Sequence, residues 1–543
     1  MRHLHIIGFA LLLCCSSGKL GGQEPPLRPN IVIILVDDMG YSDIGCYGGE
    51  IETPNLDALA DGGLRFTQFY NAGRCCPTRA SLLTGLHPHQ VGIGHMTENP
   101  ERPLGFTGPY QGFLNDNCTT IANVLRGAGY HTLMTGKWHL GYHSQTTWPL
   151  QRGFDKFYGC LAGGFNYFKP GGNRGLTLGN APVESPAEFY ATDTLTDVAC
   201  DFLSEVSQAD DEPFLLDRAE NAPHWPLKAK WEEYRKYQGK YTDGWEALMA
   251  ERFAKQKALG MWPDELTPAP HVGPTWESLS DKQREDCAAI MAAYAGCIDS
   301  IDQNVGKLIA HLESLGKRDN TLILFLSDNG SCQEGGVLGK GDEAMIKNPP
   351  LETTDGVRLG LAWANASNTP FRLYKHFVHE GGSCTPFIVS WPKLLTNDRA
   401  GTFVRQAAYL PDFMATCLEL SGADYPADVP PHVGTSLMPL IQGSDAAIHT
   451  NPLYFEHEGN AALRWRNWKL VREYKKPWEL YDIEADRTEL DDLSDSQPSQ
   501  RREMIAMWEK WATTHQVAFP ERFNMYDFLK KQRKKKKKQP AGK

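Results

Sequence analysis

The chain has 543 residues, of which 41% are hydrophobic and 22% charged, and this composition argues for a globular protein with a large core. Its formal net charge is −11, but residues 530–543 contain nine Lys or Arg and no acidic residue, so the remainder carries −20. An acidic body argues against nucleic acid as the main partner. The basic tail is predicted to be disordered, and it could be an electrostatic tether or have no specific role.

Residues 1–18 have the pattern of a signal peptide. Arg2 precedes an apolar stretch from Ile6 to Leu13, which is too short to cross a bilayer. The residues before Cys14 and Cys15 are not the small ones usual before a lipidated cysteine, so a lipoprotein is the less favoured alternative. We expect an exported protein, periplasmic or secreted, without a transmembrane segment. Cysteine spacing does not identify any disulfide pair.

The first strand is predicted at Ile31–Val36, a continuous β-branched and apolar run that is typical of a parallel strand buried on both faces. Asp37 and Asp38 follow it directly. Open α/β sheets bind their ligands at the carboxyl ends of strands, where these two carboxylates would lie. Taken alone, however, an Asp-Asp pair is more often a polar turn.

A short helix is predicted from the stretch Gly73-Arg-Cys-Cys-Pro-Thr-Arg-Ala-Ser-Leu-Leu-Thr-Gly85. Pro77 suits a first helical turn, and Gly85 is suited to end the helix. Cys75 and Arg79 would then lie at or near the helix N-terminus, where free N–H groups favour an anion. A cysteine there could be a reactive thiolate, or it could be a buried thiol of a capped surface helix.

Two further predicted strands end in polar residues. Residues 130–135 form a strand after a helix at 119–126, and they lead to Lys137 and His139 in Gly136-Lys-Trp-His-Leu-Gly141. Residues 213–219 lead to His224 in Asn221-Ala-Pro-His-Trp-Pro226. This second strand carries the charged residues Asp217, Arg218 and Glu220. Because buried charges are costly unless paired, we expect either a local salt network or an exposed strand end.

A matching strand at Thr321–Leu326 ends in Ser327-Asp-Asn-Gly330. Asp37, Asp38, Asp328 and Asn329 would share one sheet edge. Their ligand atoms are all oxygens, which suits Ca²⁺, with Mg²⁺ as the less favoured alternative, rather than zinc.

The last third of the chain contains a buried strand at 386–391 and, from about residue 451, short strands separated by turns and followed by a helix at 500–514. Lys375 stands five residues before Glu380 and is a candidate site residue, which we rank above its neighbours Arg372 and His376. The pattern predicts a small antiparallel α/β subdomain.

Together these motifs resemble, in order, those of the type I sulfatases over about residues 28–515, with bacterial arylsulfatases most similar. The signature is Cys75-x-Pro-x-Arg-Ala-Ser-Leu-Leu-Thr-Gly85, joined by the elements around Lys137, His224 and Asp328. The resemblance implies the alkaline-phosphatase-like α/β fold, with a large central mixed sheet and a smaller C-terminal antiparallel subdomain. We expect the domains to span 28–445 and 446–520.

The resemblance also implies the chemistry. Cys75 would be oxidised to formylglycine by a formylglycine-generating or sulfatase-maturing enzyme, and the hydrated aldehyde would cleave a sulfate ester to alcohol and inorganic sulfate. The implied catalytic residues are Cys75, Arg79, Lys137, His139, His224 and Lys375. The implied calcium ligands are Asp37, Asp38, Asp328, Asn329 and the converted Cys75.

Two other functions stay open at this stage. One is a phosphate or phosphonate ester hydrolase on the same scaffold, although the Ser or Thr nucleophile and the His/Asp zinc ligands of that group are missing from the motifs. The other is an inactive protein that binds sulfated glycans. The sequence does not identify the alcohol as aryl, steroid or sugar.

Overall fold

The computed structural model describes residues 27–97, 107–341, 356–395 and 398–517. The expected signal peptide, 1–18, and the basic tail, 530–543, lie outside the described residues. Within the described residues, no helix has the length and apolar character needed to cross a membrane. The eleven cysteines in this part of the chain are buried thiols.

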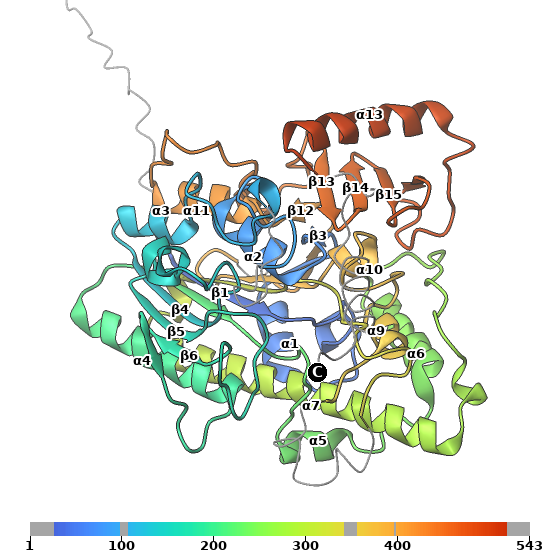
Figure 1. Ribbon diagram of the computed structural model, residues 1–543, viewed down its shortest axis with the longest axis horizontal. Coiled ribbons are helices and arrows are strands. Elements are labelled where there is room, and N and C mark those ends of the chain that lie inside the picture. The colour runs from blue at the N-terminus through green and yellow to red at the C-terminus, as the bar shows by residue number, and fades with distance from the viewer. Residues whose placement is uncertain (1–26, 98–106, 342–355, 396–397, 518–543) are drawn as a thin grey trace, which may run out of the picture.

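A mixed sheet forms the centre of the molecule (Figure 1). In the described part of the chain its strand order is β11 (Thr402–Val404), β2 (Leu64–Phe66), β10 (Phe387–Ser390), β9 (Thr321–Ser327), β1 (Asn30–Val36), β8 (Phe214–Ala219), β4 (His131–Lys137), β5 (Lys156–Cys160), β6 (Leu176–Leu178) and β7 (Ala181–Val183). Strands β9, β1, β8, β4 and β5 are parallel to one another. Their carboxyl ends therefore share one edge, as the sequence predicts.

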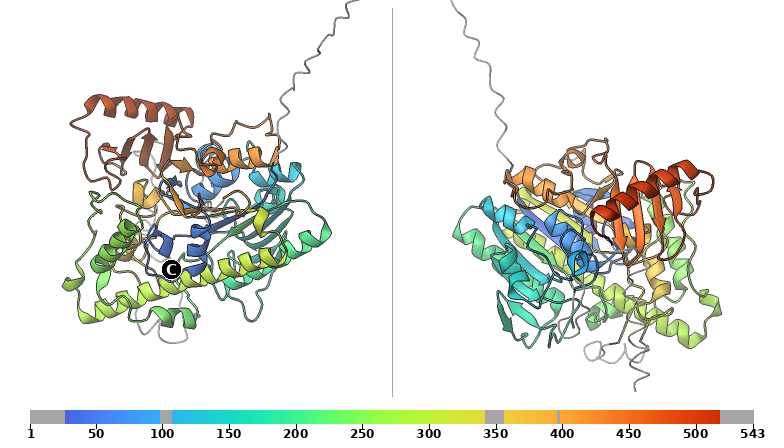
Figure 2. Two further views of the ribbon diagram at one scale, coloured as in Figure 1. Left: turned by 180° about the vertical axis from the view of Figure 1, so that it is seen from behind. Right: turned by 45° about the horizontal axis from the view of Figure 1, so that its top comes forward.

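Strand β1 shows how the sheet is covered. Its side chains alternate between two hydrophobic clusters, with Ile31 and Ile33 in one and Val32 and Ile34 in the other, and all are fully buried. The first cluster includes residues of α2 (Cys75–Thr84), α3 (Ile121–Gly127) and α11 (Asp412–Ser421). The second includes residues of α1 (Pro54–Asp61), α4 (Ala191–Ala209) and the long α7 (Asp281–Ser314). Helices thus sandwich the sheet, and Figure 2 shows α7 running along its length.

The remaining elements connect these layers. Further α-helices of this body are α5 (Trp231–Tyr237), α6 (Gly244–Ala258), α9 (Leu361–Ser367), α10 (Glu380–Ser383) and α12 (Met438–Ile441). A small parallel pair consists of β3 (Phe69–Tyr70) and β12 (Ala408–Tyr409). Short 3₁₀ helices lie at Gly45–Tyr47, Gly108–Tyr110, Gln145–Thr147, Pro149–Arg152, Trp276–Ser278 and Arg318–Asn320.

The charged strand β8 is buried along its whole length. Asp217 is level with Ile33 of β1 and Arg218 with Ile34, so these two side chains point to opposite faces of the sheet. Arg218 forms an ion pair with Glu220, which confirms the salt-network alternative for these two residues. The alternative of an exposed strand end is wrong. Burial raises the pKa of Asp217 to about 7, against the opposing effect of Arg79.

The C-terminal part forms a separate antiparallel sheet. Its strands are β13 (Leu453–His457), β14 (Asn460–Trp465), β15 (Trp468–Arg472) and β16 (Glu479–Asp482), and α13 (Pro498–Thr514) lies across them (Figure 2). Leu463, Leu470 and Leu480 face Met504 and Trp508 of α13 in one hydrophobic cluster. The predicted antiparallel α/β arrangement is therefore confirmed.

A buried ion network holds this sheet against the central body. Lys469 of β15 has its Nζ 2.7 Å from Glu380 Oε1 and 2.8 Å from Glu489 Oε1. Arg487 Nη2 lies 2.7 Å from Glu380 Oε2. The Lys469, Glu380 and Glu489 side chains are at most 1% exposed. Removing one cation would therefore leave a buried carboxylate without compensation.

We expect Lys469→Met to lower the free energy of unfolding by about 3–5 kcal/mol, because it breaks a buried ion pair from one side. Denaturant unfolding followed by tryptophan fluorescence measures this loss. The matched control is Lys255→Met, which removes the exposed pair with Glu251 and should cost less than about 1 kcal/mol. Equal effects of the two substitutions would contradict a stabilising role for the network.

Candidate active site

Polar residues from distant parts of the chain meet at the carboxyl edge of the central sheet. Asp37 and Asp38 follow β1, Asp328 follows β9, Lys137 ends β4, and His224 follows β8. These strands are neighbours in the sheet, so the positions lie side by side. Residues separated by up to 291 positions thereby form one buried cluster.

Asp37 is paired with Lys137. The Lys137 Nζ donates to Asp37 Oδ2 at 2.6 Å, and both side chains are fully buried. Burial opposes ionisation of Asp37, but Lys137, His224 and Arg79 together lower its pKa below the ordinary value. The second oxygen, Asp37 Oδ1, is buried without a hydrogen-bond partner.

Asp38 has several polar neighbours in the cluster. Lys375 Nζ lies 2.6 Å from its Oδ1 and 2.8 Å from its Oδ2. Asn329 Nδ2 donates to Oδ1 at 2.7 Å, and the Asp38 N–H donates to Asp328 Oδ1 at 3.3 Å. Asp38 has a φ of 74°, a left-handed conformation that is costly for a non-glycine residue. The surrounding contacts hold the backbone in this position.

Arg79 fixes Asp328 to helix α2. Its Nε and Nη2 donate to Asp328 Oδ2 at 3.2 and 2.8 Å, and its Nη1 donates to the Lys137 carbonyl at 2.9 Å. Burial and the neighbouring Asp37 raise the pKa of Asp328, whereas Arg79 opposes this shift. One guanidinium thus joins α2 to the ends of β9 and β4.

Cys75 is the first residue of α2, as predicted, and Gly85 ends the helix in the left-handed conformation. A hydrogen bond from the Cys76 thiol lowers the pKa of Cys75. Although burial opposes this effect, Lys137 and His139 lower the pKa further. The helix N-terminus therefore faces a position that favours an anion.

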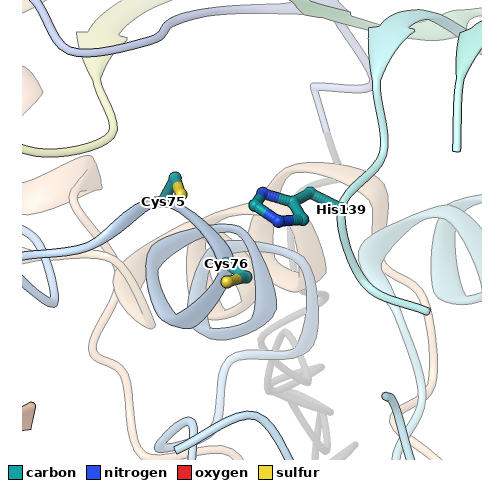
Figure 3. A group of neighbouring side chains, drawn as sticks. All are labelled: Cys75, Cys76 and His139. Atoms are coloured by element: carbon teal, nitrogen blue, oxygen red, sulfur yellow. The ribbon is translucent and has the colours of Figure 1, made fainter. Parts of the chain in front are cut away.

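His139 lies beside both thiols of the first turn of α2. One ring nitrogen and the sulfurs of Cys75 and Cys76 are all within 4.8 Å of one another (Figure 3). Burial lowers the pKa of His139 to about 4, so its imidazole is neutral near pH 7. His139 has a φ of 58°, and the strand geometry of β4 ends before it, at Lys137.

His224 lies beside Asp38, despite the unusual strand that precedes it. Its Nε2 is 3.6 Å from Asp38 Oδ2, while its Nδ1 lies 2.6 Å from the Trp225 carbonyl. That carbonyl can only accept, so Nδ1 carries a proton and Nε2 faces the cluster. Burial lowers the pKa of His224, with Asp38 opposing.

The oxygen-rich part of the cluster fits a hard divalent cation. Asp37, Asp38 and Asp328 supply carboxylates, and Asp37 Oδ1 and Asn329 Oδ1 are buried oxygens without a partner. Unpartnered buried oxygens are costly, and a cation would satisfy them. His224 lies in the same group, with ligand atoms of His224, Asp37 and Asp38 within 4.8 Å of one another.

The structure separates Lys375 from its two lower-ranked neighbours. Arg372 points to the C-terminal sheet, where its Nη1 is 3.2 Å from Glu479 Oε2 and 3.0 Å from the Tyr481 hydroxyl. His376 points to a group on the hairpin between β13 and β14. Lys375 is the member that reaches Asp38.

Two features of the site were missed from the sequence. Gly163 and Gly164 pack on the two histidines: a Cβ on Gly163 would lie 3.0 Å from His139 Nε2, and one on Gly164 would lie 2.6 Å from His224 Nδ1. The two adjacent glycines follow the parallel strand β5, and this pattern could have indicated a close approach of the backbone to the site. The ion pair of Arg74 with Glu334, at 3.2 Å, joins residues 260 positions apart and had no local signal.

Comparisons with known proteins agree on one family. Residues 29–423 match the family described as "Sulfatase", and residues 371–516 match "N-sulphoglucosamine sulphohydrolase, C-terminal". The chain is 32% identical to an uncharacterized sulfatase of Schizosaccharomyces pombe, over 92% of this chain and 96% of the relative. It is 34% identical to the arylsulfatase of Klebsiella aerogenes, over 76% of this chain and 91% of the relative. The human N-acetylgalactosamine-6-sulfatase is 30% identical, over 78% and 68%.

Solved structures share the fold. The crystal structure of Ps i-CgsB has a TM-score of 0.68 at 27% identity, covering 92% of this chain and 96% of that one. A phosphonate monoester hydrolase of Agrobacterium radiobacter has a TM-score of 0.56 at 21% identity, covering 90% of this chain and 96% of that one, a likeness of fold alone. The fold is therefore the alkaline-phosphatase-like α/β fold, with its large mixed sheet. On the extent of these matches, the chain belongs to the sulfatase family and is a sulfuric ester hydrolase.

Proposed function

We propose that this sulfatase works with a formylglycine made from Cys75 and with a calcium ion. The observation that carries the proposal is the convergence of three buried cations and the α2 N-terminus on the surroundings of Cys75. Lys137 and Lys375 each lower the pKa of Cys75. Arg79 lies about one helical turn after Cys75 on α2. Such a set of fixed positive charges suits the charge that develops on sulfate oxygens during transfer.

The balance of charges shows what a divalent cation would contribute to substrate binding. Asp37, Asp38 and Asp328 are matched one to one by Lys137, Lys375 and Arg79. With these six groups ionised the cluster is neutral, and a bound Ca²⁺ would leave it with two positive charges. A net positive, buried site favours an anionic ester even though the body of the protein is acidic, because screening over about 8–10 Å isolates it from surface charges.

Formylglycine at position 75 would supply two hydroxyls on one carbon, one to attack sulfur and the other to release sulfate afterwards. In this proposal a formylglycine-generating or sulfatase-maturing enzyme makes it. The neutral imidazole of His139 would accept a proton from a hydroxyl at position 75. Arg79 would hold α2 against the ends of β9 and β4, and this contact would keep position 75 in place.

His224 and Lys375 would serve the leaving alcohol. Both lie against Asp38, and the Nε2 of His224 faces the cluster. Uptake of a second proton at His224 Nε2, which Asp38 and Asp37 favour against the effect of burial, would let the imidazolium give a proton to the ester oxygen as the S–O bond breaks. The Lys375 ammonium would stabilise negative charge on that oxygen. Asp37, Asp38, Asp328, Asn329 and the group at position 75 would hold the calcium ion.

We expect peptide mass spectrometry of active protein to show an aldehyde at position 75 and an unmodified thiol at Cys76. Cys75→Ala should reduce hydrolysis of 4-nitrophenyl sulfate to background. Cys76→Ala is the matched control, since Cys76 contacts the Met96 sulfur at 3.5 Å and should only adjust local packing. Fully active protein with a free thiol at Cys75 would refute the assignment.

Elemental analysis should find one calcium per chain in wild-type protein and none in Asp38→Asn. A chelator should lower the melting temperature of the wild type, because a cation that binds the folded protein and not the unfolded chain stabilises the folded state. The same chelator should leave Asp38→Asn unaffected. Asp302→Asn, which changes a buried carboxylate held by Asn55 and Leu56, is the control and should keep its calcium. Stoichiometric zinc in place of calcium or magnesium would contradict the proposal.

His224→Gln should lose far more activity on an alkyl or sugar sulfate than on 4-nitrophenyl sulfate. A general acid matters most when the leaving alcohol is poor, and its help is typically worth about 10²–10⁴-fold. Steady-state kinetics on both ester types measure the difference, with His131→Gln at the opposite end of β4 as control. An equal loss on both esters would show that His224 binds sulfate or supports the loop instead.

A further inference from the structure

A cleft between the C-terminal sheet and the central body has no part in the reaction proposed above. Its volume is about 310 Å³, whereas a cavity needs only ~10–15 Å³ to hold one water molecule. The cleft therefore has room for a small ligand together with water. Three of its lining side chains are arginines, and the charged or titratable members of the lining are Arg405, Asp445, His449, Arg464, Arg466 and Glu484. We refer to it as the Arg464 cleft.

Arg464 is the buried charge of the cleft. It lies on β14, and its side chain is only 4% exposed. Its Nη2 lies 2.7 Å from Glu484 Oε1 and donates to Gln68 Oε1 at 3.2 Å. Its Nε and Nη1 are buried and have no hydrogen-bond partner among the described residues. Unpaired buried donors are costly and rare in native proteins, so these N–H groups indicate a missing acceptor.

The carboxylate of Glu484 shows that an oxyanion fits beside Arg464. The Glu484 side chain is 57% exposed, so this acceptor reaches the buried guanidinium from the solvent side. A pair with such an exposed partner is weak, and the partner is easily displaced. A sulfate ion has more acceptor oxygens than a carboxylate and twice its charge, and it would therefore satisfy more of the Arg464 donors.

Two further cations are held at the cleft without a carboxylate partner among the described residues. Arg405 donates from Nη1 to the Met261 carbonyl at 2.8 Å and from Nη2 to the Gly260 carbonyl at 2.7 Å. The guanidinium carbon of Arg466 lies 4.4 Å from the centre of the Trp465 ring. Carbonyl and ring contacts fix the position of a guanidinium but leave its net charge uncompensated. The cleft is therefore locally positive although the body of the protein is acidic.

The ion network behind the cleft also lacks one negative charge. Burial opposes ionisation of Glu380, but Arg487, Lys469 and Arg464 together lower its pKa. These three cations face two fully buried carboxylates, Glu380 and Glu489. The ion pair that Arg464 itself makes is with an exposed carboxylate. An anion bound at Arg464 would compensate the excess charge and would stabilise the docking of the C-terminal sheet.

The cleft is separate from the candidate active site. The nearer end of β14 is Asn460, whose Nδ2 donates to the carbonyl of His376, the residue after Lys375. Arg464 lies four residues further along the strand, which corresponds to about 13 Å. A ligand held by Arg464 would therefore not occupy the place of the reacting ester.

We propose that the Arg464 cleft binds an oxyanion of the sulfate type, either free sulfate or the sulfate group of a larger molecule. Arg464 supplies the buried donors, and Arg405 and Arg466 supply charge at the rim. Three arginines would repel a metal ion, and an apolar ligand would leave the donors unpaired. Hydrolysis of a sulfate ester releases inorganic sulfate, so the protein meets this anion whenever it turns over. The site does not depend on a formylglycine at position 75.

Selenate, which has the shape and charge of sulfate, gives a direct test of location. Crystals of the full chain soaked in sodium selenate should show an anomalous peak in the cleft within hydrogen-bond distance of Arg464. The same soak of Arg464→Gln crystals should show no peak there. A selenate peak confined to the candidate active site in wild-type crystals would overturn the proposal.

Isothermal titration calorimetry with sodium sulfate, at an ionic strength held constant with sodium chloride, measures the affinity. Arg464→Gln should raise the Kd of the cleft about 10-fold or more, and Arg466→Gln about 3- to 10-fold. Glu484→Gln should lower the Kd, because it removes the competing carboxylate. Arg501→Gln changes an arginine of α13 outside the cleft and is the matched control. Arg466 is exposed, so its variant keeps the test valid if Arg464→Gln misfolds.

Two further measurements separate the possible sources of the anion and the two sites. In Cys75→Ala, a signal sensitive to Arg466→Gln that appears with sulfate assigns the cleft to the free anion, whereas one that appears only with 4-nitrophenyl sulfate assigns it to the sulfate group of a larger molecule. Inhibition of 4-nitrophenyl sulfate hydrolysis by sulfate reports on the candidate active site and should be the same in wild type and Arg466→Gln.

Equal titrations of wild type, Arg464→Gln and Arg466→Gln would refute the cleft as an anion site. That result with normal ester hydrolysis would leave the proposed function intact. Conversely, selenate in the cleft of a protein that hydrolyses no sulfate ester would refute the proposed reacting centre and leave the cleft as an anion site.

Discussion

Buried charge at the carboxyl edge of the central sheet must be compensated before the surrounding strands and helices can pack there. Three carboxylates and three cations are fully or almost fully buried there, and an unpaired ion in such a place is severely destabilising. Each pair joins a different set of elements: Asp37 with Lys137 joins β1 to β4, and Arg79 with Asp328 joins α2 to β9. The fold and the geometry of the candidate active site are therefore maintained by the same contacts.

The C-terminal sheet serves both stability and the site. On one side, Lys469 enters an ion network with Glu380 and Glu489 that fastens the sheet to the central body. At one end, the hairpin between β13 and β14 brings His457 and Glu458 to the residue after Lys375. A change in how this sheet docks would therefore alter the segment that carries Lys375 as well as stability.

Much of the site could be predicted because its members occur in short local motifs. Cys75 and Arg79 lie on one predicted helix, and Asp37, Lys137 and Asp328 each follow a strand that is recognisable from its apolar run. Strand β8 was harder to interpret, because Asp217 and Arg218 break the apolar pattern. Its charges are accommodated by the Arg218–Glu220 pair and by a raised pKa of Asp217, which depend on neighbours far away in the chain.

The types of chemical group, the local elements that carry them and the edge of the sheet where they gather can be read from the amino-acid sequence, since these follow from hydrophobic periodicity and from strand direction. The pairings between the groups depend on the tertiary structure. Asp37 pairs with Lys137, whereas the adjacent Asp38 pairs with Lys375. These pairings follow from the order of the strands and from the left-handed backbone at Asp38. The same holds for the meeting of His376 with His457: contacts between residues so far apart depend on how layers pack, which no local pattern encodes.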